Sequence, residues 1–458
     1  MLSQDQAAGI FSRVKEFASA DEVEVSFFST ANALTRFANN VIHQNMAEEN
    51  VVVSVRASFG KKTARATTNK LDDDSLKNVV RAAESLAKVQ HPDEDLAEMY
   101  DARTGEAPVP TRAFPATAAI TPEQRAETVG KIVEVAQKSN LTTAGIVASS
   151  QYTEGIFNSR GIERWHGQTS SEISITMLAE DSSGWQKANS PDAAQLDAVK
   201  LAEIAAGKAR LSAKPREIPA GKYTVILEPA AVLDMAGFMF YDFGGLAILD
   251  QRSFLNNRVG TKVFGVNIDI WDDVAHPLQS GAAFDGEGVP RQKVQLVEKG
   301  VVKQLVFARA SAERMKNSEY KDKVGPIAAT GHGFSLPNEM GEAPMNIVFG
   351  TPASPQTLDQ MIASTERGIL VTRLWYIREV DPYEKILTGM TRDGTFLVEN
   401  GKIQHGVLNF RFNESLIHLL SNVEAMGMPV RASGEESFDM VVPAMKVRDF
   451  NFTEVTKF

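Results

Sequence analysis

Cysteine is absent from the 458-residue chain. This absence excludes disulfide bonds, thiolate metal ligands and a cysteine nucleophile together. Long apolar runs are absent too, since none approaches the about 18 to 20 residues of a membrane-spanning helix. The first residues, MLSQDQAAGIFSRVKEF, lack the basic and apolar segments of a secretory signal. We therefore expect a soluble, cytoplasmic protein that has no membrane partner.

A concentrated basic surface is also missing from the sequence. The 48 Lys and Arg residues are scattered among 58 Asp and Glu residues, and the formal net charge is -10. Proteins that bind nucleic acid usually gather positive charge on one face. Direct binding of nucleic acid is therefore disfavoured, whereas an acidic surface is compatible with a protein partner.

What the chain does contain is enough apolar sequence for a sizeable core. Hydrophobic residues make up 43% of the chain and charged residues 23%, as in ordinary globular proteins, and the length favours about three domains. We predict an α+β protein. Two small helix-strands-helix units, residues 1–105 and 106–220, precede a larger, mostly antiparallel β-rich domain at residues 221–458.

The first unit combines two helical patterns with three strand patterns. Apolar residues recur with helical spacing in residues 4–20, and a second amphipathic helix follows three aspartates at residues 75–89. Between these helices, β-branched residues separated by polar turns predict three strands. The predicted strands are residues 23–30, 34–45 and 50–69.

The second unit follows a linker with four prolines, residues 91–119. Thr121 and Gln124 form a capping-box pattern around Pro122, which predicts the start of a helix. A last helix is predicted to begin with a proline and to span residues 191–211. The strand patterns between these two helices lie near residues 146–150, 156–158 and 173–178.

The third domain begins with a short apolar strand, YTVILEP, at residues 223–229. Two hairpins are indicated by turn dipeptides between strand patterns, Lys299-Gly300 and Asn400-Gly401. Asn and Gly both accept the positive φ of a type I′ turn, so the second signal is the firmer one. Repeated hairpin signals of this kind are typical of a mostly antiparallel β domain.

Four stretches of the third domain form a distinctive set in this order: FDGEGVPRQKVQLVEKGVV (284–302), GILVTRLWYIREVDP (368–382), LTGMTRDGTFLVENGKI (387–403) and NFRFNES (409–415). These stretches resemble the TldD/PmbA family, whose members were first described as modulators of DNA gyrase and are regarded as metallopeptidases. The N-terminal DEVEVSFF with its following strands and helix also looks like the first domain of that family. The resemblance covers essentially the whole chain. It implies that residues 1–105 are the first domain of the family and that residues 221–458 are its metalloprotease-like domain.

The zinc motif that this family implies is missing. Its catalytic members carry H-E-x-x-x-H on a helix after a buried strand, together with a downstream cysteine. Two imidazoles on one helix face can hold zinc while the adjacent Glu acts as a base. In this chain the two His positions fall near Met235 and Phe240, and no residue from 229 to 255 is His or Glu. The chain is therefore similar to the TldE-like (PmbA-like) members that lack the motif. It is expected to bind no cofactor itself, and zinc is expected in a TldD-like partner subunit.

One other group could hold a metal ion. The seven histidines lie more than ten residues apart, which excludes chelation by two neighbouring histidines. The segment WDDVAHP brings Asp272, Asp273 and His276 close together, and these are the remaining metal candidates. The alternative interpretation is a loop whose carboxylates cap backbone N–H groups.

Five further residues are candidates for contact with a substrate or a partner. His332 lies between two glycines in a predicted exposed loop. Trp375 and Tyr376 lie in an apolar strand, where they belong either to the core or to a binding surface. Arg411 and Asn413 lie two residues apart on a predicted strand and therefore face the same side. This pair either holds a peptide or partner loop, or forms a structural hydrogen-bond pair.

We therefore expect a non-catalytic, zinc-site-lacking subunit of a TldD/TldE-type metallopeptidase complex, a heterodimer or higher oligomer. Its substrates would be unfolded or small peptides, captured by added β-strand contacts. Two alternatives remain open. One is an autonomous metallopeptidase that uses the atypical ligands Asp272, Asp273 and His276. The other is a binding protein that modulates a DNA topoisomerase.

Overall fold

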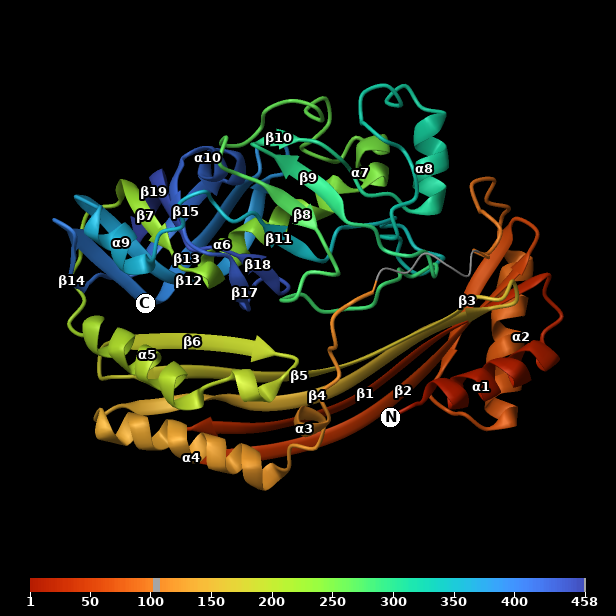
Figure 1. The fold of residues 1–458 in the computed structure, drawn as a ribbon, viewed down its shortest axis with the longest axis horizontal. Coiled ribbons are helices and arrows are strands. Elements are labelled where there is room, and N and C mark those ends of the chain that lie inside the picture. The colour runs from red at the N-terminus through yellow and green to blue at the C-terminus, as the bar shows by residue number, and fades with distance from the viewer. Residues whose placement is uncertain (102–107, 457–458) are drawn as a thin grey trace.

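The computed structural model describes residues 1–101 and 108–456 and shows a long curved sheet that lies against a β-rich C-terminal part (Figure 1). The predicted boundary between residues 105 and 106 lies outside the described residues. Mixed α+β structure agrees with the prediction. No helix in the two described ranges is long and apolar enough to cross a membrane.

The long sheet contains six antiparallel strands in the order β3-β2-β1-β4-β5-β6. Strands from both predicted N-terminal units therefore pair within one sheet, and β1 joins them by pairing with β4. The strands are β1 (Glu22–Ala38), β2 (Val41–Phe59), β3 (Lys62–Thr68), β4 (Thr142–Asn158), β5 (Glu163–Leu178) and β6 (Ser183–Ser190).

Several predicted strand boundaries in this sheet are wrong. The chain turns at Asn39 and Asn40, whose φ angles are 51° and 62°. The predicted strand 34–45 therefore spans a hairpin turn, and β1 runs without a break through residues 31–33. Asn tolerates positive φ, so this Asn-Asn pair was a turn signal that the strand pattern masked. The short strands predicted at 146–150 and 156–158 are likewise parts of β4.

Two pairs of helices cover one face of the sheet, one pair near each end (Figure 1). The Thr121–Gln124 capping box is present as predicted. The helix predicted at residues 191–211 starts later, because the side chain of Asp197 accepts from Lys200 N and caps it there. The helices are α1 (Gln4–Phe17), α2 (Asp73–Val89), α4 (Pro122–Lys138) and α5 (Ala198–Leu211), with the short α3 (Pro115–Ala118) and the 3-10 turn η1 (Ala193–Gln195).

The C-terminal part lies over the other face of the sheet and contains two sheets of its own. In the larger sheet the order is β12-β7-β19-β15-β13-β14, and an additional β12–β13 pairing closes five strands into a ring, with β16 added beside β19. These strands are β7 (Gly221–Leu227), β12 (Arg367–Asp381), β13 (Ile386–Glu399), β14 (Lys402–Gly406), β15 (Phe410–Ser415), β16 (Val423–Met426) and β19 (Met445–Val455).

The smaller C-terminal sheet has the order β10-β9-β8-β11-β18-β17. Both predicted hairpins are present, with positive φ at Lys299, Gly300, Asn400 and Gly401. The strands are β8 (Ile270–Asp272), β9 (Val294–Glu298), β10 (Val301–Val302), β11 (Ile347–Phe349), β17 (Val430–Ala432) and β18 (Met440–Val442). The helices of this part are α6 (Pro229–Ala236), the 3-10 helix η2 (Gly237–Phe243), α7 (Gly245–Leu249), α8 (Arg309–Lys316), α9 (Leu358–Ala363) and α10 (Leu416–Ser421).

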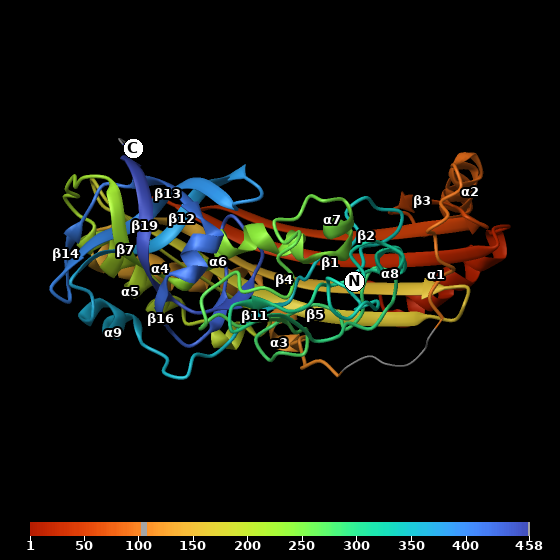
Figure 2. The same cartoon turned by 90° about the horizontal axis from the view of Figure 1, so that it is seen from above.

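Polar side chains of the long sheet and its helices hold the C-terminal part in place. Seen from above, the C-terminal part covers much of the length of the sheet (Figure 2). At one end Arg65 Nε donates to the carbonyl of Leu336 at 2.7 Å. At the other end Lys208 Nζ lies 2.7 Å from Glu228 Oε2. The two parts therefore form one continuous body around the cavities described next.

Candidate functional site

The segment in which the family resemblance predicts the zinc motif forms α6 and continues directly into η2. Pro229 occupies the first turn of α6, where its missing N–H costs nothing. Met235 is 1% exposed and Phe240 is 0% exposed, and both belong to the main hydrophobic core of the C-terminal part. The residues at the predicted zinc positions therefore fill the core and offer no ligand atom toward a metal ion.

Asp234, on the same helix, holds a loop. Its Oδ1 accepts hydrogen bonds from the backbone N–H groups of Glu435 and Glu436 at 3.1 and 3.0 Å. The loop approaches so closely that a Cβ on Gly434 would lie 2.1 Å from the same oxygen. Burial raises the pKa of Asp234 from 3.8 to about 7, although the two N–H groups oppose this rise. The carboxyl group is thus engaged with backbone.

Asp242, in η2, belongs to a buried ion pair. Its Oδ2 lies 2.5 Å from Nζ of Lys385, which also contacts Glu379 Oε1 at 2.7 Å. Its Oδ1 accepts from Phe254 N at 3.2 Å. Burial raises the pKa of Asp242, and Lys385 opposes this effect. Both carboxylates of the segment therefore have structural partners, and the segment does not fit a zinc ion. Across residues 1–101 and 108–456, no group of three or more His, Asp or Glu is placed to hold a metal ion.

A cavity of about 480 Å³ opens beside this segment. One wall is the outer face of η2, with Phe238 and Tyr241. The rest of the lining includes charges of both signs, among them Lys385, Arg252 and Glu436. The cavity thus combines aromatic surface with mixed charge. Its complete lining is Gly237, Phe238, Tyr241, Asp242, Arg252, Glu379, Pro382, Lys385, Glu436, Ser437 and Phe438.

A second cavity, of about 410 Å³, lies between the long sheet and the C-terminal part. Ser26, Phe28 and Ile156 of the sheet form its floor, and loops of the C-terminal part cover it. Phe438 borders both cavities. Phe438 belongs to the loop between β17 and β18, the same loop that Asp234 holds through Glu435 and Glu436. This loop therefore lies between the two cavities.

His332 is buried, so the prediction of an exposed loop is wrong. Its side chain is 0% exposed, its Nε2 lies 3.0 Å from Oδ1 of Asp272, and its Nδ1 lies 3.0 Å from the hydroxyl of Thr330. The flanking Gly331 has φ of 74°, and a Cβ there would lie 2.2 Å from the carbonyl of Pro290. The glycines that suggested an exposed loop instead permit close packing of backbone. His332 is therefore not available to a partner.

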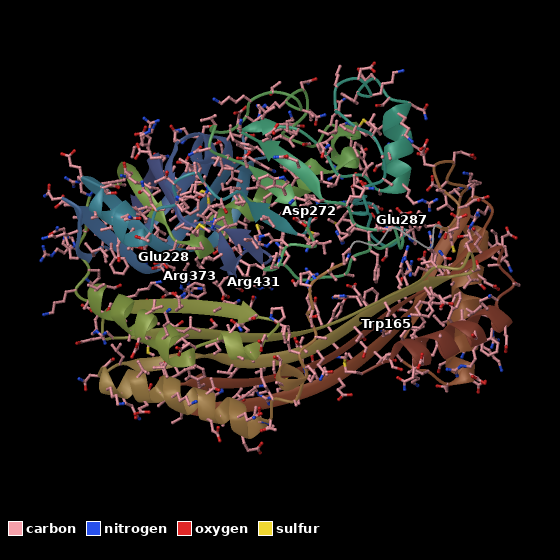
Figure 3. The ribbon with its side chains drawn as sticks, viewed as in Figure 1. Trp165, Glu228, Asp272, Glu287, Arg373 and Arg431 are labelled. Atoms are coloured by element: carbon pink, nitrogen blue, oxygen red, sulfur yellow. The ribbon has the colours of Figure 1, made fainter. Side chains whose placement is uncertain are left out.

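Asp272 lies in the C-terminal part, where Figure 3 labels it. It is buried and faces His332. Its Oδ2 accepts from Met345 N and Asn346 N at 2.7 and 2.8 Å. Burial by itself raises the pKa of Asp272, but the facing His332 and the hydrogen bonds outweigh burial and hold this pKa below its ordinary value. Asp272 and His332 were separate candidates in the sequence, and the fold makes them one buried pair.

The other two metal candidates point elsewhere. Asp273 lies 2.8 Å from Nζ of Lys293 and accepts from Ala275 N at 3.1 Å. Nδ1 of His276 accepts from Leu278 N at 3.2 Å. Burial lowers the pKa of His276. Asp273 and His276 thus act as turn caps, which matches the alternative interpretation of this segment.

Trp375 and Tyr376 lie at a bulge of β12. Trp375 is partly buried, and the guanidinium groups of Arg373 and Arg392 lie over its ring. Tyr376 has φ of 55° and is 53% exposed, so it is not a core residue. Its N–H donates to Oε1 of Glu436 at 2.6 Å. Glu436 lines the 480 Å³ cavity, so Tyr376 stands beside it.

Arg411 and Asn413 lie on the outer face of β15, as their spacing predicted. Their neighbours Phe410 and Phe412 point into the core. Neither residue lines the two cavities described above. The structure therefore does not bring this pair to the other candidate residues.

Sequence reasoning missed two buried carboxylates in the FDGEGVP segment. Asp285 accepts from the N–H groups of Glu287, Val289 and Gly333. Burial raises the pKa of both Asp285 and Glu287, and the negative charge of Asp285 adds to the rise at Glu287. Figure 3 labels Glu287 in the C-terminal part, and the charge of Arg56 on β2 acts on its pKa. The Gly residues of the segment were a turn signal, but no local pattern reveals which backbone N–H groups a carboxylate will meet.

Asp234 leads to a prediction about pH. In the folded protein the carboxyl group of Asp234 keeps its proton up to about pH 7, whereas in the unfolded chain it releases the proton near pH 4. Because the folded state binds more protons in this window, ionisation of Asp234 lowers the free energy of unfolding as pH rises from 4 to 7. Asp234→Asn removes this ionisable group. Between pH 4 and 7, the free energy of unfolding of the variant relative to that of wild type should therefore increase by about 1 kcal/mol for each unit that the pH rises.

Urea unfolding between pH 4.5 and 7.5 measures this slope. Asp322→Asn, at an exposed position, is the matched control and should follow wild type. Parallel pH profiles for wild type and Asp234→Asn would contradict the prediction.

Two sequence profiles match the chain. The profile of the PmbA/TldA metallopeptidase C-terminal domain matches residues 220–454, and that of PmbA/TldA metallopeptidase domain 1 matches residues 23–87. The chain is 21% identical over 396 residues to "Metalloprotease PmbA" of Escherichia coli O157:H7, covering 83% of this chain and 82% of that protein. It is 22% identical over 425 residues to "Metalloprotease PmbA homolog" of Haemophilus influenzae, covering 86% and 85%.

Solved structures share the fold over nearly the whole chain. TldE from Thermococcus kodakarensis superimposes with a TM-score of 0.84 at 18% identity, covering 98% of this chain and 100% of TldE. A Thermotoga maritima protein named as a candidate modulator of a DNA gyrase gives 0.84 at 20% identity, with the same coverage. At these low identities the superpositions establish a shared fold and nothing more. The C-terminal profile, however, spans half of the chain, and the chain therefore belongs to the PmbA/TldD metallopeptidase family.

Proposed function

We propose that this chain is a non-catalytic subunit of a TldD/TldE-type metallopeptidase complex. The observation that carries the proposal is the burial of Met235 and Phe240, which pack into the core near the two positions where the family resemblance predicts zinc-binding histidines. The carboxylates of the same segment, Asp234 and Asp242, are engaged by backbone N–H groups and by Lys385. A chain built in this way requires another subunit for hydrolysis.

The partner in this proposal is a TldD-like chain that carries the zinc ion. The two chains form a heterodimer or a higher oligomer, and the partner supplies the metal and the base. The name TldE belongs to a protein of the same fold from Thermococcus kodakarensis. The full coverage of that protein by this chain supports an equivalent place for both in their assemblies.

The contribution of this chain is peptide binding. The 480 Å³ cavity offers aromatic surface at Phe238 and Tyr241, and charges of both signs at Lys385 and Glu436. A short peptide presents apolar side chains together with a terminal ammonium and a terminal carboxylate, so this lining matches its chemistry. The cavity lies directly against the segment that bears zinc in catalytic relatives, which suits unfolded or small peptides as substrates.

Co-expression with a zinc-bearing relative tests the proposal. The two chains should elute together in size exclusion, contain zinc in proportion to the partner, and cleave an unstructured peptide only when both are present. Stoichiometric metal and peptidase activity in this chain alone would overturn the proposal. A loss of that activity in His276→Ala would then favour the autonomous enzyme. Absence of both complex and activity would also contradict the proposal.

A further inference from the structure

The first twelve of the nineteen residues of strand β2 form a free sheet edge. β2 pairs with β1 along its length, but β3 pairs only with residues Val53–Phe59 of β2 (Figure 2). Within the described parts of the chain, no strand pairs with the other side of residues 41–52. Every residue from 41 to 50 is exposed, including those on both faces of the strand. We call residues 41–52, VIHQNMAEENVV, the free edge.

The free edge has little protection against pairing with another chain. Natural proteins usually guard such edges with Lys, Pro, a bulge or a covering segment. The free edge contains no Lys and no Pro, and its one bulge is at His43, where the register with β1 shifts. Val41, Ile42 and Met46 are 59%, 42% and 37% exposed. An exposed apolar edge of this length is typical of a surface that pairs with a partner strand.

A hollow lies beside the free edge. A cavity of about 390 Å³ is lined by Ala47, Glu48 and Glu49 of β2 and by neighbouring residues of β1 and β4. Thr117 and Ala118 of α3 close one side of it. A strand added to the edge would bring its side chains to the rim of this cavity. The sheet therefore has a hollow on its surface beside the free edge, in addition to the unpaired edge itself.

The sequence of the free edge is complementary to itself in antiparallel pairing. Two identical strands related by a two-fold axis place one residue opposite its own copy. An axis at Met46 sets His43 opposite Glu49 and Gln44 opposite Glu48, and no two carboxylates face each other. An axis at Glu48 or Glu49 would instead oppose like charges, which is unfavourable. The register centred on Met46 also sets Val41 opposite Val51.

We propose that the free edge is an assembly surface whose partner is the free edge of a second copy of this chain. Strand β2 of one copy pairs antiparallel with β2 of the other, with Met46 at the two-fold axis. The two long sheets thereby become one continuous sheet. This assembly is separate from the binding of a zinc-bearing subunit, and it leaves the cavities of 480 Å³ and 410 Å³ free.

Sedimentation velocity of the purified chain tests the assembly. Wild type should be a dimer, and Met46→Lys should weaken dimerisation by at least about tenfold, because two ammonium groups then face each other at the axis. Val89→Lys, at an exposed apolar position of α2 far from this edge, is the matched control and should remain dimeric. Circular dichroism checks that each variant keeps the wild-type fold.

Cysteine cross-linking tests the register, and the absence of native cysteine makes it unambiguous. Met46→Cys should form a disulfide-linked dimer on mild oxidation. Val52→Cys should not, because the register separates the two copies of residue 52 by about 40 Å. A monomeric wild type, a dimer unaffected by Met46→Lys, or pairing of this edge only with a zinc-bearing relative would overturn the inference. Peptidase activity of the co-expressed complex is a separate readout, so the proposed function can fail or hold independently.

Discussion

Asp272→Ala is expected to lower the free energy of unfolding by about 3 to 5 kcal/mol, a large part of the about 5 to 15 kcal/mol that natural proteins have. The carboxylate accepts two backbone N–H groups, from Met345 and Asn346, and faces His332. When the carboxylate is removed, the two backbone N–H groups are left without an acceptor and His332 loses its buried ion-pair partner. Urea unfolding at pH 7 measures the loss.

The neighbouring Asp273→Ala is the matched control. Asp273 pairs with Lys293, whose side chain is 61% exposed, and caps one turn. Removing it should cost about 1 kcal/mol or less. Equal losses in the two variants would contradict the assignment of Asp272 as a buried anchor. If wild type bound a metal ion and Asp272→Ala, Asp273→Ala and His276→Ala each lost it to the same extent, the interpretation of these residues as metal ligands would be supported instead.

The effect of Asp272 should also depend on pH. The folded-state pKa of Asp272 lies below its ordinary value, so its stabilisation is complete above about pH 4 and is lost as pH falls toward the folded-state pKa. The difference in the free energy of unfolding between wild type and Asp272→Ala should therefore become smaller below pH 4. This direction is opposite to that of Asp234, whose raised pKa costs stability as pH rises.

Features that depend on neighbouring residues were predictable from the sequence. The Thr121–Gln124 capping box and the Asn400-Gly401 turn each need only a few adjacent residues, and both are present. The Asn39-Asn40 turn was missed because β-branched and apolar residues on both sides produced an unbroken strand pattern. Local signals fail where two patterns overlap in one segment.

Features that depend on distant residues could not be predicted in this way. His332 is buried because Asp272, far away in the sequence, lies 3.0 Å from its Nε2, and because Gly331 lets the backbone of Pro290 approach. The family resemblance predicted a degenerate zinc segment near Met235 and Phe240. It did not reveal the cavity beside that segment, because Lys385 and Phe438 reach it from separate loops.

Lys385→Met should be as damaging as Asp272→Ala. Lys385 is 4% exposed and neutralises Asp242, which is 7% exposed. Methionine keeps the length of the side chain and removes the charge. Because Asp242 is then a buried charge without a cationic partner, a loss of about 3 to 5 kcal/mol is expected. Lys303→Met, which breaks a surface pair with Glu298, should change stability by less than about 1 kcal/mol.

A double-mutant cycle separates the charge from the packing of this pair. Asp242→Asn removes the stranded charge, so Lys385→Met with Asp242→Asn should be more stable than Lys385→Met alone, with a coupling of about 1 to 3 kcal/mol. Strict additivity would contradict the ion pair. The pH dependence gives a second check. Without Lys385 the pKa of Asp242 rises further, so the folded state keeps a proton that the unfolded chain releases near pH 4. The deficit of Lys385→Met should therefore grow as pH rises above 4, and it should become independent of pH once Asp242 is replaced.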